Sequence, residues 1–179
     1  MGAYKKDINY IVTKADAQAM IDRARNPRDK ALFALLYLTG ARESELIELR
    51  EKDIIASIEE KLVYIRLTTK KLGRVKGFVI GDRTLEIPRD APFMDAVINW
   101  ASIKPGLLFE INESRVRQLV YEYSDNRFCP MNFRHSRLTK LSRAGASVDE
   151  LMYFKGAADL KSVGSYIRAK PIGRELVIE

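Results

Sequence analysis

The 179-residue sequence contains one cysteine, Cys129, and one histidine, His135. A single thiol excludes an internal disulfide and is typical of a reducing compartment. The chain therefore has no paired histidines and no Cys-x-x-Cys motif, which are the usual signatures of zinc sites. We expect no bound metal.

Long apolar runs and phosphate loops are also missing. The longest apolar run, residues 31–38, is far shorter than the roughly 20 residues that a helix needs to cross a bilayer. The first six residues lack the apolar core of a secretory signal. Gly73 and Gly77 are not followed by Lys-Ser or Lys-Thr, which argues against a P-loop. We expect a cytoplasmic protein, nucleoid-associated or in a host cell, with no membrane partner.

Charge of one sign is in excess. The chain has 31 Lys and Arg against 24 Asp and Glu, a formal charge of +7 and a pI near 9.5. This excess favours a polyanionic partner such as nucleic acid, although a basic but unspecialised surface explains the charge alone equally well. The length suits one domain with a substantial core.

Capping residues and helical spacing mark the first part of the chain as helical. Thr13-Lys14-Ala15-Asp16 resembles a capping box. Asn26-Pro27 begins a second helix that ends at Gly40. Its residues are apolar almost all round, which predicts a central core helix. A third short helix is predicted from about residue 43 to residue 50.

The middle of the chain changes to alternating, β-branched residues. Residues 62–69, 77–80 and 84–87 are predicted strands. Four cations occur in residues 70–76, so we predict a small antiparallel sheet whose hairpin carries positive charge. The pattern is helical again from residue 91, and the predicted fold class is mainly α with a small antiparallel β-sheet (α+β). Further helices are predicted to begin near residues 92, 112, 131, 147 and 159.

Three cations recur every three residues in the helix after Pro130: Arg134, Arg137 and Lys140. Such a face can contact phosphates, although an ordinary solvated face is the common alternative. Arg134 also belongs to a second set, with Arg42 and Tyr166. Two guanidiniums and one phenol are the groups needed to hold a phosphodiester and attack it covalently.

Three stretches, in the right order, resemble the catalytic domain of the tyrosine recombinases (phage integrases). An archaeal or viral member of the family is one expectation. Residues 39–46, Thr-Gly-Ala-Arg-Glu-Ser-Glu-Leu, are similar to the family's Thr-Gly-x-Arg-x-x-Glu-Leu box. Residues 133–136, Phe-Arg-His-Ser, are similar to its Leu-Arg-His-Thr. Residues 145–166 match the family's spacing without insertion and put Tyr166 at the nucleophile.

The resemblance implies a site-specific recombinase or integrase of a mobile element, which cuts and rejoins DNA through a 3′-phosphotyrosyl intermediate. Tyr166 would attack the phosphate held by Arg42 and Arg134, with Glu45 supporting Arg42. Lys70 would be the general acid, and His135 a further catalytic or supporting residue. No cofactor is implied. Lys71 and Lys76 are alternatives to Lys70, and Arg74, Arg137 and Lys140 are the expected DNA contacts.

The expected partner is double-stranded DNA, on which copies of the chain would form a dimer or tetramer, with a monomer possible when free. Two departures from the family pattern, Met131 and Ala157, replace histidines (Trp in some members at the second). They motivate an alternative, a catalytically weakened or inactive DNA-binding module of the same fold. A helical basic nucleic-acid-binding protein whose tyrosine is structural is a third reading.

The resemblance covers residues 12–168, so we expect residues 1–179 to form a single catalytic domain with a tail from residue 169 to residue 179. No core-binding domain fits before Thr13. The chain is accordingly expected to be either an excised catalytic fragment or a short natural form. The apolar Leu176-Val177-Ile178 in the tail would dock on its own domain or on a partner.

Overall fold

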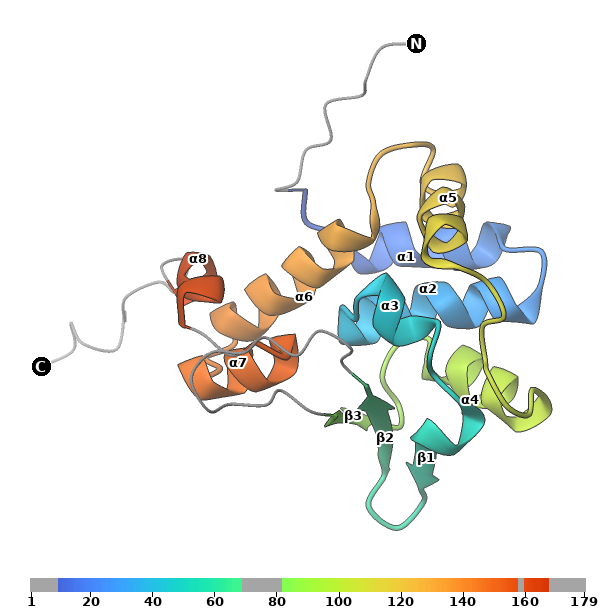
Figure 1. Cartoon of the computed structure of the whole chain (residues 1–179), viewed down its shortest axis with the longest axis horizontal. Coiled ribbons are helices and arrows are strands. Elements are labelled where there is room, and N and C mark those ends of the chain that lie inside the picture. The colour runs from blue at the N-terminus through green and yellow to red at the C-terminus, as the bar shows by residue number, and fades with distance from the viewer. Residues whose placement is uncertain (1–9, 69–81, 158–159, 168–179) are drawn as a thin grey trace, which may run out of the picture.

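The computed structural model describes residues 10–68, 82–157 and 160–167 (Figure 1). Helices dominate and a three-stranded antiparallel sheet lies at one side, which confirms the predicted α+β class. No helix in the described ranges is long and apolar enough to span a membrane. The elements are α1 (Lys14–Arg23), α2 (Pro27–Thr39), α3 (Glu43–Leu46), η1 (Glu51–Asp53), β1 (Ile54–Ser57), β2 (Leu62–Leu67), β3 (Arg83–Pro88), α4 (Met94–Ile103), α5 (Glu113–Tyr123), α6 (Pro130–Arg143), α7 (Val148–Lys155), η2 (Leu160–Ser162) and α8 (Gly164–Ile167).

Helix α2 is the centre of the core. It packs against α1, α4 and α6, and residues 31–36 are fully buried. The Asn26 side chain accepts a hydrogen bond from the Asp29 amide at 2.9 Å, and Pro27 occupies the first turn. These contacts confirm the predicted start and the predicted burial on all sides, because a helix surrounded by other elements has no face left for polar residues.

The start of α1 also follows its local signal. The Asp16 amide donates to Thr13 Oγ1 at 3.1 Å, and the Thr13 amide donates to the Asp16 carboxylate at 2.9 Å. These two bonds are the reciprocal capping box. The box satisfies backbone donors at the helix start without any help from tertiary contacts.

The sheet has the order β1-β2-β3, with both pairs antiparallel. In β3 the side chains alternate strictly, so that Arg83, Leu85 and Ile87 face the core. Strand β1 was not predicted, and β2 ends at Leu67, two residues earlier than predicted. The predicted strand 77–80 and the cationic segment of the predicted hairpin, residues 70–76, lie outside the described residues.

The third predicted helix is shorter than expected. Helix α3 ends at Leu46, not near residue 50, because the backbone beyond it pairs with a distant segment. The Leu108 amide donates to the Leu49 carbonyl at 2.9 Å, and Arg50 forms a β-bridge with Leu107. Long-range pairing therefore replaces the helical bonds that local propensity favours.

Helix α6 connects the main core to a smaller lobe formed by α7 and α8 (Figure 1). The smaller lobe has a hydrophobic cluster of its own, made by Leu138, Leu151, Val163 and Tyr166. Helix α6 also packs on α2, and Gly40 at the end of α2 lies close to it. A Cβ atom on Gly40 would lie 3.0 Å from the Arg134 Cα and 3.2 Å from the Arg137 Cβ.

Gly40→Ala is expected to lower the free energy of unfolding by about 2–3 kcal/mol, since the left-handed backbone (φ +57°) and the contact with α6 both resist a side chain. Gly106→Ala is the matched control, because Gly106 also has positive φ (+77°) but meets no atom within 4 Å. Urea unfolding of both variants measures the difference. Equal losses would contradict a close α2–α6 contact.

Candidate active site

Arg42 lies at the N-terminal cap of α3, two residues after Gly40 at the end of α2. Its Nη1 donates to Glu45 Oε1 at 2.9 Å, and its amide donates to Glu45 Oε2 at 2.8 Å. The side chain remains 32% exposed while the Glu45 side chain is 1% exposed. Glu45, one helical turn away, thus holds the backbone amide and one guanidinium nitrogen of Arg42, while the rest of the guanidinium remains partly accessible to solvent.

Arg134 approaches the same place from α6 and is buried, with 5% exposure. Its guanidinium donates to the Gly40 carbonyl at 3.0 Å and to the Lys155 carbonyl. Burial, and then the positive charge of Arg42, lower the pKa of Arg134 to about 10, while Glu45 opposes this shift. Arg134 is still charged at neutral pH, in a place where positive charge predominates.

Tyr166 lies on α8 and is buried against the small hydrophobic cluster. Its carbonyl accepts a hydrogen bond from Ser142 Oγ at 2.7 Å, which ties α8 to α6. Burial raises the pKa of the Tyr166 hydroxyl, and the charge of Arg134 acts in the opposite direction. Arg134 therefore lies near enough to interact electrostatically with both Arg42 and Tyr166, although the three residues are far apart in the sequence.

His135 faces the same phenol. Its Nδ1 is 3.4 Å from the Tyr166 hydroxyl, and the two ring centroids are 5.4 Å apart. Burial lowers the pKa of His135, so that the imidazole is neutral at pH 7 and can accept a proton. The sequence indicated His135 as a catalytic or supporting residue, and the contact with Tyr166 is what only the fold reveals.

The other two cations of α6 do not form the open face that the sequence indicated. The Lys140 ammonium donates to the Val12 carbonyl at 3.1 Å and lies 4.7 Å from the centre of the Tyr37 ring. The Arg137 guanidinium lies 5.6 Å from the centre of the Phe154 ring. Both are half-buried because α6 is covered by α2 and α7. Their role as DNA contacts stays a prediction.

The four predicted hairpin residues, Lys70, Lys71, Arg74 and Lys76, lie outside the described residues. Their roles as general acid and DNA contact stay predictions. At the two departures from the family pattern, Met131 is 50% exposed on the first turn of α6, and Ala157 follows the end of α7. Neither side chain can donate a hydrogen bond to a phosphate.

Arg83 on β3 was missed at the sequence level. Its guanidinium donates to both oxygens of Glu45, at 2.8 and 3.0 Å, and its Nε donates to the Phe154 carbonyl at 3.0 Å. The alternation of residues along β3 could have revealed it, since Arg83 lies on the same face of the strand as the buried Leu85 and Ile87. A cation on the core face of a strand requires a buried acidic partner.

The Glu45 carboxylate is at the centre of these contacts. Burial by itself would raise its pKa, but the hydrogen bonds and charge of Arg83, the Arg42 amide and the charge of Arg134 together lower it to about 2. Glu45 is therefore ionised at neutral pH.

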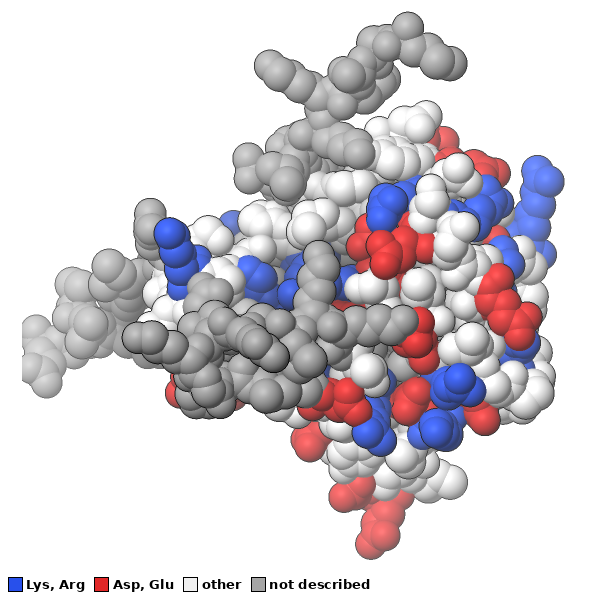
Figure 2. Space-filling view, in the orientation of Figure 1, with Lys and Arg blue, Asp and Glu red and all other residues white. Residues whose placement is uncertain are grey.

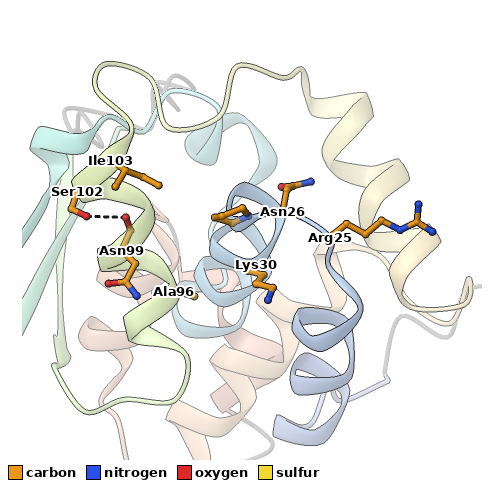
Figure 3. A pocket seen from close by; sticks show the side chains of 8 residues that line it. Arg25, Asn26, Lys30, Ala96, Asn99, Ser102 and Ile103 are labelled. Atoms are coloured by element: carbon orange, nitrogen blue, oxygen red, sulfur yellow. Dashed lines mark hydrogen bonds between the residues drawn. The ribbon is translucent and has the colours of Figure 1, made fainter.

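A hollow of about 590 Å³ lies at the opposite end of α2, between the α1–α2 turn and α4 (Figure 3). Arg25 and Lys30 line it, but Arg42, Arg134 and Tyr166 do not. On the face shown in Figure 2 the blue and red side chains of the described residues are interspersed. The candidate site is therefore recognised by its side chains and not by this hollow.

No protein-family model matches the chain. The tyrosine recombinase XerC from Alcanivorax borkumensis is 25% identical in an alignment that covers 89% of this chain and 54% of the relative. The XerA recombinase structure superposes with a TM-score of 0.69 at 18% identity, covering 88% of this chain and 59% of that one. The catalytic domain of bacteriophage HP1 integrase gives a TM-score of 0.63 at 18% identity, covering 90% and 88%.

The chain has the fold of a tyrosine recombinase catalytic domain. The match to the HP1 integrase domain extends over most of both chains. The chain spans about half the length of the curated relative. In this chain, residues 39–46 lie at the end of α2 and in α3, residues 133–136 lie in α6, and residues 145–166 extend over α7 and into α8.

Glu45→Gln is expected to remove a pH-dependent part of the stability. The pKa of Glu45 falls from 4.5 to about 2 on folding, so the contribution is present above pH 4.5 and is lost as the pH falls toward 2. It amounts to about 3 kcal/mol. Urea unfolding at pH 7 and pH 3 measures it, with the exposed Glu59→Gln as control. An unchanged pH dependence in Glu45→Gln would contradict the assignment.

Proposed function

We propose that this chain is the catalytic part of a site-specific DNA recombinase or integrase, which cuts and rejoins double-stranded DNA through a 3′-phosphotyrosyl intermediate. The observation that supports the proposal is that Arg134 lies within electrostatic reach of both Arg42 and Tyr166, in a chain with the tyrosine recombinase fold. The positive charge of Arg42 disfavours the charged form of Arg134, and an anion bound by both side chains would relieve this repulsion. A phosphodiester supplies that charge.

The reaction begins with attack of the Tyr166 oxygen on phosphorus. A bond forms between that oxygen and phosphorus, and the bond to the 5′-oxygen breaks. Arg42 and Arg134 stabilise the charge that develops on the non-bridging oxygens. The 5′-hydroxyl of a partner strand then reverses the step and releases Tyr166, so the bond energy is conserved and no cofactor is consumed.

Two protons move in this step. The neutral imidazole of His135 is positioned to accept the phenolic proton, given its 3.4 Å separation from the Tyr166 hydroxyl. The leaving 5′-oxygen takes a proton from a lysine of the 70–76 segment, with Lys70 preferred and Lys71 and Lys76 as alternatives. Together these groups meet the needs of both the nucleophile and the leaving group.

Double-stranded DNA is the proposed partner, in the cytoplasm, on nucleoid or host-cell DNA. One solved structure with this fold is XerH recombinase bound to its difH substrate, with a TM-score of 0.65 at 18% identity, covering 86% of this chain and 47% of that one. Because strand exchange needs two or more cut strands at once, we propose that copies of the chain assemble as a dimer or tetramer on DNA.

A second candidate is a DNA-binding module that does not cut. It is favoured by Met131 and Ala157, which remove two polar side chains from the site. The two candidates predict the same binding and differ only in covalent chemistry.

A nicked duplex that traps the cleaved strand separates the candidates, using a site selected from a random library by binding. Wild type is expected to form a protein–DNA adduct that survives denaturation, and Tyr166→Phe to form none. Arg134→Ala and Arg42→Ala are expected to slow adduct formation about 10²–10³-fold, the effect of losing one transition-state donor. Tight binding by wild type without any adduct would leave the non-cutting module as the function.

His135→Gln is expected to change the pH dependence of adduct formation. In wild type the rate falls as the pH drops through the pKa of His135, which burial holds below its ordinary 6.5, because the protonated imidazole cannot accept the phenolic proton. The variant is expected to be slower and to lack this inflection. Single-turnover rates from pH 5 to 8 measure it, and an identical inflection in His135→Gln would assign the proton to another group.

A further inference from the structure

Arg83 makes contacts that a residue serving only the sheet does not need. It is 3% exposed, and its guanidinium forms a two-bond fork with Glu45, which lies 38 residues earlier in the chain. Its Nε reaches the Phe154 carbonyl near the end of α7 at 3.0 Å. One side chain from β3 therefore joins the Arg42 segment to the segment that leads to Tyr166.

The turn after α7 is shaped around this guanidinium. A Cβ atom on Gly156 would lie 2.7 Å from Arg83 Nη1 and 3.1 Å from its Cζ. Gly156 also has a positive φ of +60° and ends α7. The absence of a side chain at Gly156 leaves the volume that Arg83 fills, and Ala157 comes directly after it.

Glu45 transmits the position of Arg83 to Arg42. Its Oε1 accepts from Arg83 at 2.8 Å and from Arg42 at 2.9 Å, while its Oε2 accepts from Arg83 and from the Arg42 amide. The planar fork of an arginine fixes the orientation of a carboxylate in a way that a lysine, with a single charged atom, cannot. The direction of the Arg42 guanidinium depends on that orientation.

We propose that Arg83 is a positioning residue of the phosphate site. By holding Glu45 and the turn at Gly156, it presents Arg42 to the phosphodiester in register with Arg134 and Tyr166. This inference rests on the proposed function. It also accounts for a site with Met131 and Ala157, because two arginines that carry the whole phosphate contact must be placed accurately.

Arg83→Lys keeps the charge and removes the fork. At saturating DNA the rate of adduct formation is expected to fall about 10–100-fold, because Arg42 no longer meets the transition state in the right orientation. The Kd for DNA is expected to change less than about 3-fold, because a duplex is held by many phosphate contacts and this site makes only one of them. Arg89→Lys is the matched control, because Arg89 adjoins the same strand and pairs with the exposed Asp95 at 2.8 Å. Its rate is expected to be that of wild type.

A double-mutant cycle separates positioning from general stabilisation. If Arg83 acts through Arg42, then Arg42→Lys with Arg83→Lys is no slower than Arg42→Lys alone. Gly156→Ala, which displaces the guanidinium without removing it, is expected to reproduce the slower rate if Arg83→Lys fails to fold. Multiplied rate losses, or a lowered Tm with an unchanged rate, would overturn the proposal.

A titration with inorganic phosphate keeps this test independent of DNA cutting. Arginine side-chain NMR signals of Arg42 and Arg134 report phosphate binding, and Arg83→Lys is expected to weaken it about 3–10-fold. If wild type forms no adduct but this loss is seen, the recombinase function fails and the role of Arg83 stands. If phosphate binds equally well to wild type and Arg83→Lys, the role of Arg83 is wrong.

Discussion

The site depends on one buried carboxylate shared between guanidinium groups. Glu45 bonds to Arg42 and Arg83, and its charge also acts on Arg134. Without a carboxylate here, positive groups would be buried together without compensation, which is strongly destabilising. With it, Arg42 and Arg134 lie near enough to interact electrostatically. The same carboxylate therefore compensates the buried charge and supports the proposed phosphate site.

The parts of the site come from both lobes. Arg42 and Arg83 belong to the main core, whereas Tyr166 belongs to the small cluster of α6, α7 and α8. Arg134 connects them through its bonds to the Gly40 and Lys155 carbonyls. Attack on a phosphate requires the nucleophile and its arginines to be in register, so the contacts between the lobes matter as much as the residues themselves.

The similarity to known proteins agrees with this physical picture at the level of the domain. The XerC relative and the XerA and HP1 integrase structures share the fold, although identities are between 18% and 25%. At such identities the fold carries little information about activity. The proposed chemistry rests instead on the contact between His135 and Tyr166 and on the position of Arg134, whose pKa is lowered by burial and by the charge of Arg42.

Local signals in the sequence determined where α1 and α2 begin and that α2 is buried. The capping box of Thr13 and Asp16, the Asn26-Pro27 helix start and the buried α2 follow from short-range bonding and periodicity, and each is present in the structure. The three motif stretches predicted Arg42, Arg134 and Tyr166 as site residues. Only the tertiary structure decided the early end of α3, the half-buried Arg137 and Lys140, the His135–Tyr166 contact and the Arg83–Glu45 fork. These features arise from pairs of residues far apart in the chain, and no periodicity within one segment specifies which distant partner will meet it.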